Sequence, residues 1–441
     1  MGLASPGARG APTGLLDELR WRGLVHLASD GLESRLSAGP ISGYVGFDAS
    51  ASSLHVGHLL QVFLLTHLQR AGGRPVIVIG GATGMIGDPS GKSAERRLLD
   101  DGTIAANSAA LRGQLERFLD FSPGPTQPLM VDNRDWLAPM TMLDFLRDVG
   151  KHFTVPYMLA KDSVQARLSA GMSFTEFSYM TLQAADFLHL HRSLGVDLQM
   201  GGADQWGNIT AGLELIRRVE GRDANADEAA SSAAEPTAFG LCSPLLLTRA
   251  GQKMGKSERG AVYLDPTLTS AFDLYQYWLN DDDDLAIDHL RWLTLLDRAR
   301  IERIAADHAS RPEERIAQRA LAYDLTARIH GTTEADRQVA MAEAVFGGTV
   351  DDPDLLESLF EATGGFEFGP EAEAWTNLDL AVAAGVGSRG DARRLITQGG
   401  LTVNGERATD PAAAPPQPIA GRYWWLSLGR KRRRVGRRRA S

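Results

Sequence analysis

The chain has 441 residues, of which 43% are hydrophobic and 23% are charged. This composition is typical of a globular protein and excludes collagen, a continuous coiled coil and wholesale disorder; at roughly 100–200 residues per domain, the length allows two to four domains. The single cysteine, Cys242, excludes a disulfide framework, argues against a cysteine-based zinc site and fits a reducing cytoplasm.

Charge is unevenly spread along the chain. The formal net charge is −9, yet residues 421–441 carry nine arginine and lysine residues and no acid. A basic tail on an acidic body indicates an anionic partner, although a merely solvated tail is an equally good interpretation. No apolar run reaches ~18 residues, so we expect no transmembrane helix. Residues 1–14 lack the apolar segment of a signal peptide and are expected to be a flexible leader.

The predicted elements begin as an alternation of helices and strands. Residues 15–39 have helical spacing interrupted by glycine, and residues 43–48 predict a short strand. Residues 55–70 predict an apolar helix, and residues 74–79 predict a buried strand that opens onto glycines. Strand, helix and strand within about 40 residues make a βαβ unit, which favours a parallel sheet.

The rest of the chain is mostly helical in pattern. Helices are predicted at 104–120, 140–150, 173–194 and throughout 263–345, and a short strand at 198–200. Residues 221–238 are small, acidic and polar, which predicts a disordered surface insertion. Glycines and acids around 347–370 predict a linker, and a small basic module begins at 377.

The first candidate site is the segment His55-Val56-Gly57-His58 at a predicted loop-to-helix junction. A helix N-terminus offers free N–H groups and positive potential, and Gly57 allows a ligand to approach the backbone closely. Two imidazoles there could donate hydrogen bonds to phosphate oxygens. A metal site is the weaker alternative because no third ligand is evident, and two satisfied histidines at a helix start are another.

A second candidate is the glycine-rich loop Gly80–Lys92, which follows a predicted strand. Open α/β sheets bind ligands at such strand ends. The loop is neither GxGxxG nor a P-loop, since Ile86 stands where GxxxxGK[ST] requires its first glycine. A plain turn is the alternative, but the glycines together with Asp88, Lys92 and Arg96 favour a nucleotide.

A polar stripe marks the third candidate. Tyr179, Gln183 and Asp186 share one face of an otherwise apolar predicted helix. Buried polar groups must be satisfied, either by structural partners or by a small polar ligand. In the second interpretation Asp186 accepts from a hydroxyl, Gln183 bonds in both directions and Tyr179 contacts an ammonium or a carboxylate.

Two loops complete the set. Gly201–Asn208 follows a predicted strand and places Asp204 where a ribose diol could bind; a structural turn is about as good an interpretation. Lys253–Ser257 holds two of only six lysines in the chain. Two ammoniums on a mobile loop can close on a pyrophosphate, and a solvated basic loop is the alternative.

Taken together and in this order, these motifs resemble those of the class I aminoacyl-tRNA synthetases, specifically the bacterial tyrosyl-tRNA synthetases. His55–His58 matches the HIGH signature and Lys253–Ser257 matches KMSKS. Four longer stretches also look like that family: Gly80–Gly91, Phe145–Phe153, Ser173–Met180 and Gly201–Ile216. The resemblance runs from about Leu15 into the C-terminal module, so it covers most of the chain.

The resemblance implies an α/β fold of three parts. These are a Rossmann-type parallel-sheet catalytic domain, an α-helical anticodon-side domain and a small C-terminal α+β S4-like RNA-binding domain. The expected limits are a flexible leader at 1–14, the catalytic domain at 15–262 with a disordered insertion at 221–238, the helical domain at 263–346, a linker at 347–376, and the S4-like domain with its basic tail at 377–441. Independently of the resemblance, residues 391–396 form a short helix with arginines, and residues 401–406 predict a strand entering an Asn-Gly hairpin.

The resemblance also implies a reaction and its partners. L-tyrosine would be activated with ATP to tyrosyl-adenylate and pyrophosphate, and then transferred to the 3′-terminal ribose of tRNA(Tyr). Mg²⁺ would accompany the phosphates, with no metal held by the protein itself. We further expect a homodimer, located in the cytoplasm and without membrane contact.

Family roles are carried only onto matching positions. The expected tyrosine contacts are Tyr44, Asp88, Tyr179, Gln183, Asp186 and Gln205, with Tyr44 and Asp186 on the phenolic hydroxyl. The expected ATP contacts are Gly46, Asp48, Ser50, His55, Gly57, His58, Asp204 and Lys256. The expected catalytic groups are His55, His58, Lys253, Lys256, Lys92 and Arg96. The expected RNA contacts are Arg389, Arg393 and Arg394.

The sequence departs from the family pattern in three places. Ala49-Ser50 replaces the usual Pro-Thr, Gly255 at the third position of KMSKS is expected to loosen that loop, and the C-terminus is rich in arginine. Two other functions stay open: an RNA-binding protein that has lost catalysis, and a class I synthetase for another amino acid such as tryptophan. The intact histidine and lysine pairs argue against the first, and Tyr44 with Asp186 argues against the second.

Overall fold

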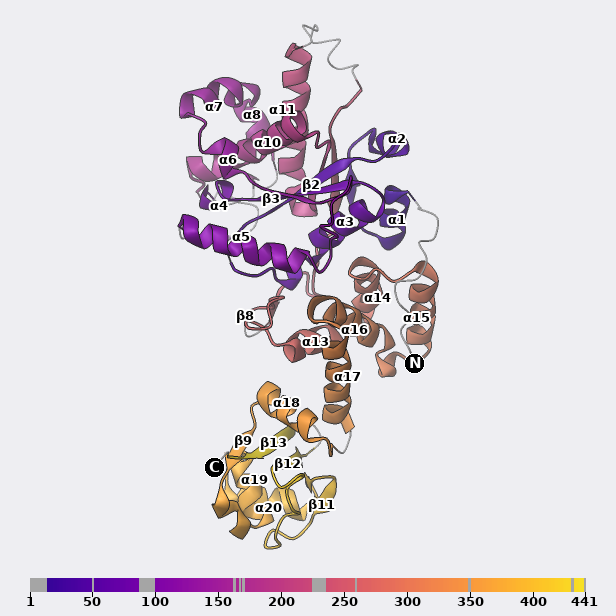
Figure 1. Ribbon diagram of the computed structural model, residues 1–441, viewed down its shortest axis with the longest axis vertical. Helices are drawn as coiled ribbons and strands as arrows, with labels where there is room; N and C mark the ends of the chain where they lie inside the picture. Colours follow the sequence, from indigo (N-terminus) through magenta and orange to yellow (C-terminus); the bar gives the residue numbers. More distant parts are fainter. Residues whose placement is uncertain are drawn as a thin grey trace. The chain divides into compact units, whose positions relative to one another are not determined.

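The computed structural model describes residues 14–49, 51–86, 100–161, 164–165, 168, 171–223, 235–257, 260–347, 350–429 and 432–439. The chain forms two compact units (Figure 1). The first comprises residues up to 268 together with 281–321, and the second comprises 269–280 together with 322 onward. None of the described helices is both long enough and apolar enough to cross a membrane.

The first unit is built on a six-stranded sheet in the order β1-β6-β5-β2-β3-β4. All neighbouring strands are parallel except β1, which pairs antiparallel with β6 at the edge. The chain moves outward from β2 to β4, then returns to β5 and β6 on the other side of β2, as in Rossmann-type folds. The predicted α/β class is therefore confirmed. The strands are β1 (Leu27–Ala28), β2 (Ser42–Phe47), β3 (Arg74–Ile79), β4 (Leu129–Asp132), β5 (Leu198–Gly202) and β6 (Phe239–Ser243).

Helices cover both faces of this sheet. Leu68 of α3 (Leu59–Arg70) lies next to Gly43, whereas Phe187 of α10 (Phe174–Leu194) packs on Tyr44. Because successive residues of a strand point to opposite faces, α3 and α10 lie on opposite faces of β2. The sheet is buried from both sides, which explains the continuous apolar runs of its strands.

Local capping signals set the helix limits. The predicted helix at 55–70 begins with a 3₁₀ turn, η1 (Val56–His58), before α3, and the one at 104–120 is α5 (Asp101–Leu115). α10 starts at a capping box in which Ser173 and Glu176 satisfy each other's backbone N–H groups, and it ends at Gly195. The other helices of this unit are α1 (Leu15–Arg22), α2 (Leu32–Ser37), α4 (Thr83–Ile86), α6 (Arg134–Leu137), α7 (Met142–Asp148), η2 (Gly150–His152), α8 (Val155–Leu159), η3 (Ala203–Gln205), α11 (Trp206–Asp223), α14 (Asp283–Trp292), α15 (Arg298–Ser310) and η4 (Pro312–Glu314).

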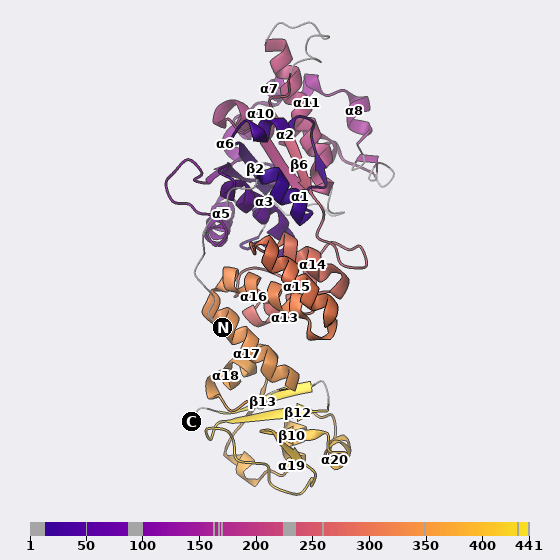
Figure 2. The same cartoon turned by 90° about the vertical axis from the view of Figure 1, so that its right-hand side faces the viewer.

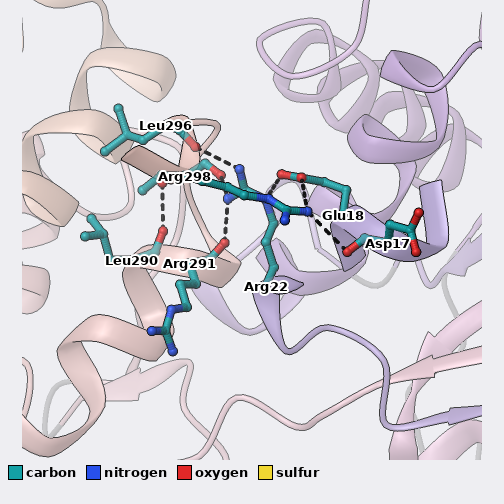
Figure 3. Close-up of polar contacts among 8 residues, drawn as sticks. Asp17, Glu18, Arg22, Leu290, Arg291, Leu296 and Arg298 are labelled. Carbon is teal, nitrogen blue, oxygen red and sulfur yellow. Dashed lines mark hydrogen bonds and ion pairs between the residues drawn. The ribbon is translucent and has the colours of Figure 1, made fainter. Parts of the chain in front are cut away.

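Arg22 fixes α1 to the segment that joins α14 and α15 (Figure 3). Its side chain is 3% exposed, and it donates to the Glu18 carboxylate at 2.7 Å. It also donates to three backbone carbonyl oxygens at 2.7–2.8 Å, those of Arg291, Thr294 and Leu296. Carbonyls at a helix C-terminus lack intrahelical partners, and the Arg22 guanidinium satisfies that of Arg291 in the last turn of α14 together with two in the segment that follows.

The second unit contains a five-stranded sheet in the order β11-β10-β12-β13-β9. Figure 2 shows its strands between α18 on one side and α19 on the other, and two apolar clusters lie on these faces. Gly405 follows the left-handed Asn404 in the β10–β11 turn, which confirms the predicted Asn-Gly hairpin. The strands are β9 (Phe366–Phe368), β10 (Leu401–Val403), β11 (Glu406–Ala408), β12 (Tyr423–Leu428) and β13 (Arg432–Arg438). The helices are α13 (Ala271–Leu279), α17 (Thr332–Gly347), α18 (Pro353–Thr363), η5 (Pro370–Ala374), α19 (Asn377–Ala383) and α20 (Arg389–Thr397), and α16 (Ile316–His330) has residues in both units.

Two predictions about irregular segments need correction. The linker predicted at 347–376 contains α18 and β9, and β9 pairs with β13. Its glycines have structural roles, since Gly364 caps α18 in the left-handed conformation. The limits of the insertion predicted at 221–238 were wrong at both ends, because residues 221–223 belong to α11 and Ala238 is buried. Residues 224–234 and the leader residues 1–13 lie outside the described residues, and the other expected domain limits stay a prediction.

Candidate active site

The candidate site lies where the strand order reverses, between β2 and β5. In open parallel sheets this switch point, at the carboxyl ends of the strands, is where ligands bind. The predicted motifs follow the carboxyl ends of neighbouring strands: the histidine pair follows β2, the glycine-rich loop follows β3 and Asp204 follows β5. The topology thus brings together motifs that are far apart in the sequence.

Tyr44 and Asp186 form the buried end of the site. Tyr44 is 2% exposed, and its hydroxyl has no hydrogen-bond partner among the described residues. Burial and the nearby Asp186 carboxylate raise the pKa of Tyr44 well above its ordinary value. Burial also raises the pKa of Asp186 to about 7. A buried hydroxyl without a partner beside a buried carboxyl is a site prepared for a further polar group.

Two residues that the sequence analysis missed hold Asp186 in place. Asn133 Nδ2 donates to Asp186 Oδ2 at 3.0 Å, and Trp136 Nε1 donates to Oδ1 at 2.8 Å. Asn133 is itself fixed by Ala82 N at 2.9 Å and Thr83 Oγ1 at 2.8 Å. A sequence signal existed for Asn133, because it directly follows strand β4, but the strand was not recognised.

A second polar group lies beside the first. Gln183 Nε2 donates to Gln205 Oε1 at 3.3 Å. Asn208 Nδ2 donates to Gln183 Oε1 at 3.2 Å and to Gln205 Oε1 at 3.1 Å. Tyr179, one turn before Gln183 on α10, is also buried. The structure therefore brings the predicted polar stripe of α10 to the predicted loop after β5, with Asn208 as an additional member.

Gly46 lies near the end of β2, and Asp48 lies in the loop that follows this strand. Gly46 is exposed although it lies in a central strand, and a methyl group on its Cα would meet no atom within 4 Å. A methyl group on Gly80 would instead lie 2.9 Å from Asp48 Oδ1, so the loops after β2 and β3 approach closely. Ser50 and Asp88 lie outside the described residues.

The two histidines are stacked, with ring centroids 3.8 Å apart. His55 Nδ1 accepts from Gly57 N at 3.1 Å, and His58 Nδ1 accepts from His55 N at 3.2 Å. Because Nδ1 is an acceptor in both neutral rings, the proton of each ring is on Nε2. The capping contacts thus orient two Nε2–H donors, the groups that the phosphate interpretation requires.

The lysine loop contacts both the histidine segment and the loop after β5. Lys253 Nζ lies 2.6 Å from Asp204 Oδ2. Gly255 has a φ of +118°, and a side chain there would lie within 3.3 Å of Gly57 N. The glycine therefore permits close packing on the histidine segment; that it also loosens the loop stays a prediction. Lys92 and Arg96 lie outside the described residues, as does the side chain of Lys256.

Comparison with known proteins identifies the family. The family model of the class I tRNA synthetases (W and Y) matches residues 36–347, and the S4 domain model matches residues 377–413. The tyrosine–tRNA ligase of Anaeromyxobacter dehalogenans is 47% identical over 95% of this chain and 97% of its own. The tyrosine–tRNA ligase of Geobacillus stearothermophilus is 43% identical over 95% of this chain and 98% of its own.

The chain belongs to the tyrosine–tRNA ligases. It is thus an aminoacyl-tRNA synthetase of class I with an S4 domain. A solved structure agrees: the C-terminally truncated mitochondrial tyrosyl-tRNA synthetase of Aspergillus nidulans has 29% sequence identity and a TM-score of 0.66, covering 76% of this chain and 94% of its own. The family assignment confirms the predicted resemblance and removes the tryptophan alternative.

The arginines of the S4 region of this ligase are partly neutralised. Arg389 on α20 pairs with Asp379 at 2.8 Å, and Arg394 pairs with Asp391. Arg393, the third predicted RNA contact, is exposed on the same helix. The arginine-rich tail is not a separate arm, because residues 432–438 form β13, where Arg437 pairs with Glu357.

Proposed function

We propose that this tyrosine–tRNA ligase carries out its two steps at the switch point, with the residue roles predicted from the sequence. In the first step a carboxylate oxygen of tyrosine attacks the α-phosphorus of ATP; an O–P bond forms and pyrophosphate leaves. In the second, the hydroxyl of the terminal ribose of tRNA(Tyr) attacks the acyl carbon, and AMP leaves. The carrying observation is the buried Tyr44 hydroxyl without a described partner beside Asp186.

Tyr44 and Asp186 bind the phenolic hydroxyl in this proposal. The Tyr44 hydroxyl gains its missing partner, and the Asp186 carboxylate accepts a hydrogen bond from the phenolic O–H of the substrate. A site built for a hydroxyl rejects an analogue that lacks it, since buried polar groups would be left unpaired; tyrosine activation is itself a standard example of this rule. Tyr179, Gln183, Gln205 and Asp88 are assigned to the amino-acid end of the substrate.

ATP binds across the loops at the carboxyl ends of the strands. The Nε2–H groups of His55 and His58 donate to the phosphates, and Gly46, Asp48, Ser50 and Gly57 line the path of the nucleotide. Mg²⁺ enters with the phosphates of ATP. Fixed donors aimed at developing charge act without reorganisation in the transition state, which is why the histidine capping contacts matter.

The Lys253–Asp204 ion pair has a direct consequence for this proposal. Asp204 is assigned to the ribose and Lys253 to the pyrophosphate, so both groups must leave each other when ATP binds. Ribose binding at Asp204 would release Lys253, which then joins Lys256, Lys92 and Arg96 around the leaving group. Movement of a lysine loop onto charge that develops late favours the transition state over the ground state.

For the second step we assign tRNA contacts to the S4 domain, with Arg389, Arg393 and Arg394 facing the phosphates. We also assign the protein to the cytoplasm, where charged tRNA is consumed. A homodimer is supported by an apolar surface on α7, α8 and the start of α10. Its members are Met142, Leu143, Leu146, Val155 and Phe174, which are 45–79% exposed, and other residues of the same three helices share one apolar cluster.

The first test is ATP–pyrophosphate exchange by the full chain with tyrosine, phenylalanine or tryptophan as the amino acid. Exchange with tyrosine alone supports the chemistry and the pocket together, and tRNA is not needed for it. Folded protein that exchanges with none of them, yet binds tRNA(Tyr), would instead favour an RNA-binding protein without catalysis.

His55→Ala separates catalysis from binding. Loss of one preorganised donor should lower the rate of adenylate formation roughly 10²- to 10³-fold. The KM for tyrosine should stay within about twofold, because the histidines do not contact the amino acid; stopped-flow measurement of adenylate formation gives both values. An equal loss of tyrosine affinity contradicts the assigned role.

A further inference from the structure

We propose that His189 is a positioning residue for tyrosine recognition: its imidazole holds the Trp136 indole in the orientation that donates to Asp186. This inference rests on the tyrosine-binding role assigned to Asp186 above.

A continuous series of contacts leads from His189 to the carboxyl group. His189 follows Asp186 by three residues on α10, and such positions are neighbours on a helix surface. The His189 ring is stacked on Trp136, with centroids 4.5 Å apart and planes 10° apart. Trp136 Nε1 in turn donates to Asp186 Oδ1 at 2.8 Å.

The two donors to Asp186 are held in different ways. Asn133 has two further hydrogen bonds, which fix its amide from both ends. The only polar group of Trp136 is the indole N–H, and it donates to Asp186. It also lies on α6, a four-residue helix that buries none of its side chains fully. The orientation of the indole therefore depends on packing, and the parallel His189 ring covers one of its faces.

The charge of His189 suits this role. Burial lowers the pKa of His189 below its ordinary value, so the ring is neutral at pH 7. A neutral imidazole stacks on the indole without offering Asp186 a competing cation. His189 therefore acts on Trp136 through its planar ring and not through a charge.

The test compares three substitutions at His189 in the full chain by ATP–pyrophosphate exchange. His189→Ala removes the ring, His189→Leu fills the space without a flat ring, and His189→Phe keeps a ring that can stack. Loss of the stack should raise the KM for tyrosine roughly three- to tenfold in the first two variants. It should also reduce their preference for tyrosine over phenylalanine, with the KM for ATP unchanged. His189→Phe should stay within about twofold of wild type, as should Ser193→Ala, an exposed position on the same helix.

Each other outcome overturns the inference. An unchanged KM for tyrosine in His189→Ala and His189→Leu shows that Trp136 is held without the stack. Equal rises for tyrosine and ATP, or a His189→Phe variant as impaired as His189→Ala, indicate a general structural role. Wild-type protein that does not exchange with tyrosine refutes the proposed function, and this inference with it.

Discussion

The carboxyl group of Asp186 is subject to opposing influences. Burial raises its pKa to about 7, whereas the hydrogen bonds from Asn133 and Trp136 act in the lowering direction. An acid with this pKa changes its protonation near neutral pH, and only the ionised form is a pure acceptor for a phenol. Because kcat/KM reports the protonation state of the enzyme without substrate, kcat/KM for tyrosine should fall as the pH decreases below 7.

Asp186→Asn tests this assignment. Hydrogen bonds to charged groups contribute about 1.5–3 kcal/mol, so the change should reduce kcat/KM for tyrosine roughly tenfold or more. The change should also reduce the preference for tyrosine over phenylalanine. The fall of kcat/KM below pH 7 should disappear, as measured by exchange kinetics between pH 5.5 and 8.5. An unchanged preference for tyrosine would mean that Asp186 does not contact the phenol.

The sequence predicted part of this site well. Gln183 and Asp186 were found because polar residues on buried elements need partners, whereas Tyr44 was found only through the family resemblance. The structure places Tyr44 near Asp186, and Gln183 in contact with Gln205. Asn133 and Trp136 were missed, because β4 is a short strand and α6 a four-residue helix, both too short for a periodic signal. Residues that act through a neighbour become visible only once the fold joins distant segments.

At the scale of elements, Arg22 is the most buried arginine or lysine in the described part of the first unit. Arg22→Ala removes the donor to three carbonyls and to one oxygen of the Glu18 carboxylate, whose other oxygen still accepts from Arg298 at 3.4 Å. We expect a loss of roughly 2–4 kcal/mol in the free energy of unfolding, measured by urea denaturation. Arg20→Ala is the matched control on the same helix: its pair with Glu33 is exposed and screened by water, so the loss should be much smaller than that of Arg22→Ala. Similar losses of stability in both variants would show that the buried hydrogen bonds of Arg22 do not stabilise the fold.

His191 joins the end of α10 to two acids. Its ring lies 3.1 Å from Asp197 and 3.0 Å from Glu220. Both carboxylates raise the pKa of His191, and Asp197 has the larger effect. A raised folded-state pKa stabilises the fold fully below the unfolded value of about 6.5 and loses that effect as the pH rises through the folded pKa. The Tm advantage of wild type over His191→Gln should thus be largest near pH 6 and shrink by pH 9. A constant difference across this range would assign the effect to packing.

The limits of elements were predicted less well than their existence. Helix 173–194 was predicted almost to the residue because Ser173, Glu176 and Gly195 are strong capping signals. The 347–376 segment was misread because a glycine that ends a helix looks, in composition, like a glycine in a linker. β13 was equally hidden, since an arginine run lacks the apolar alternation of a strand; its pairing with β12 and β9 decides its structure.

At the scale of the whole molecule, the apolar surface of α7, α8 and α10 predicts self-association. Leu143 is 79% exposed and Phe174 is 70% exposed, on helices that already share an apolar cluster beneath. Large exposed apolar side chains gathered on neighbouring helices are typical of interaction sites. In a two-fold dimer the same patch meets its own copy, so one apolar surface per chain is sufficient.

Phe174→Asp places two charges at the proposed dimer contact, one from each copy. Wild type should sediment at twice the 47.6 kDa of one chain at micromolar concentration, and the variant should shift toward a single chain. Leu268→Asp is the control, because Leu268 is 50% exposed but lies outside this surface, and it should leave the mass unchanged. If wild type sediments as a single chain, or if both variants behave alike, the apolar surface is not a contact between copies.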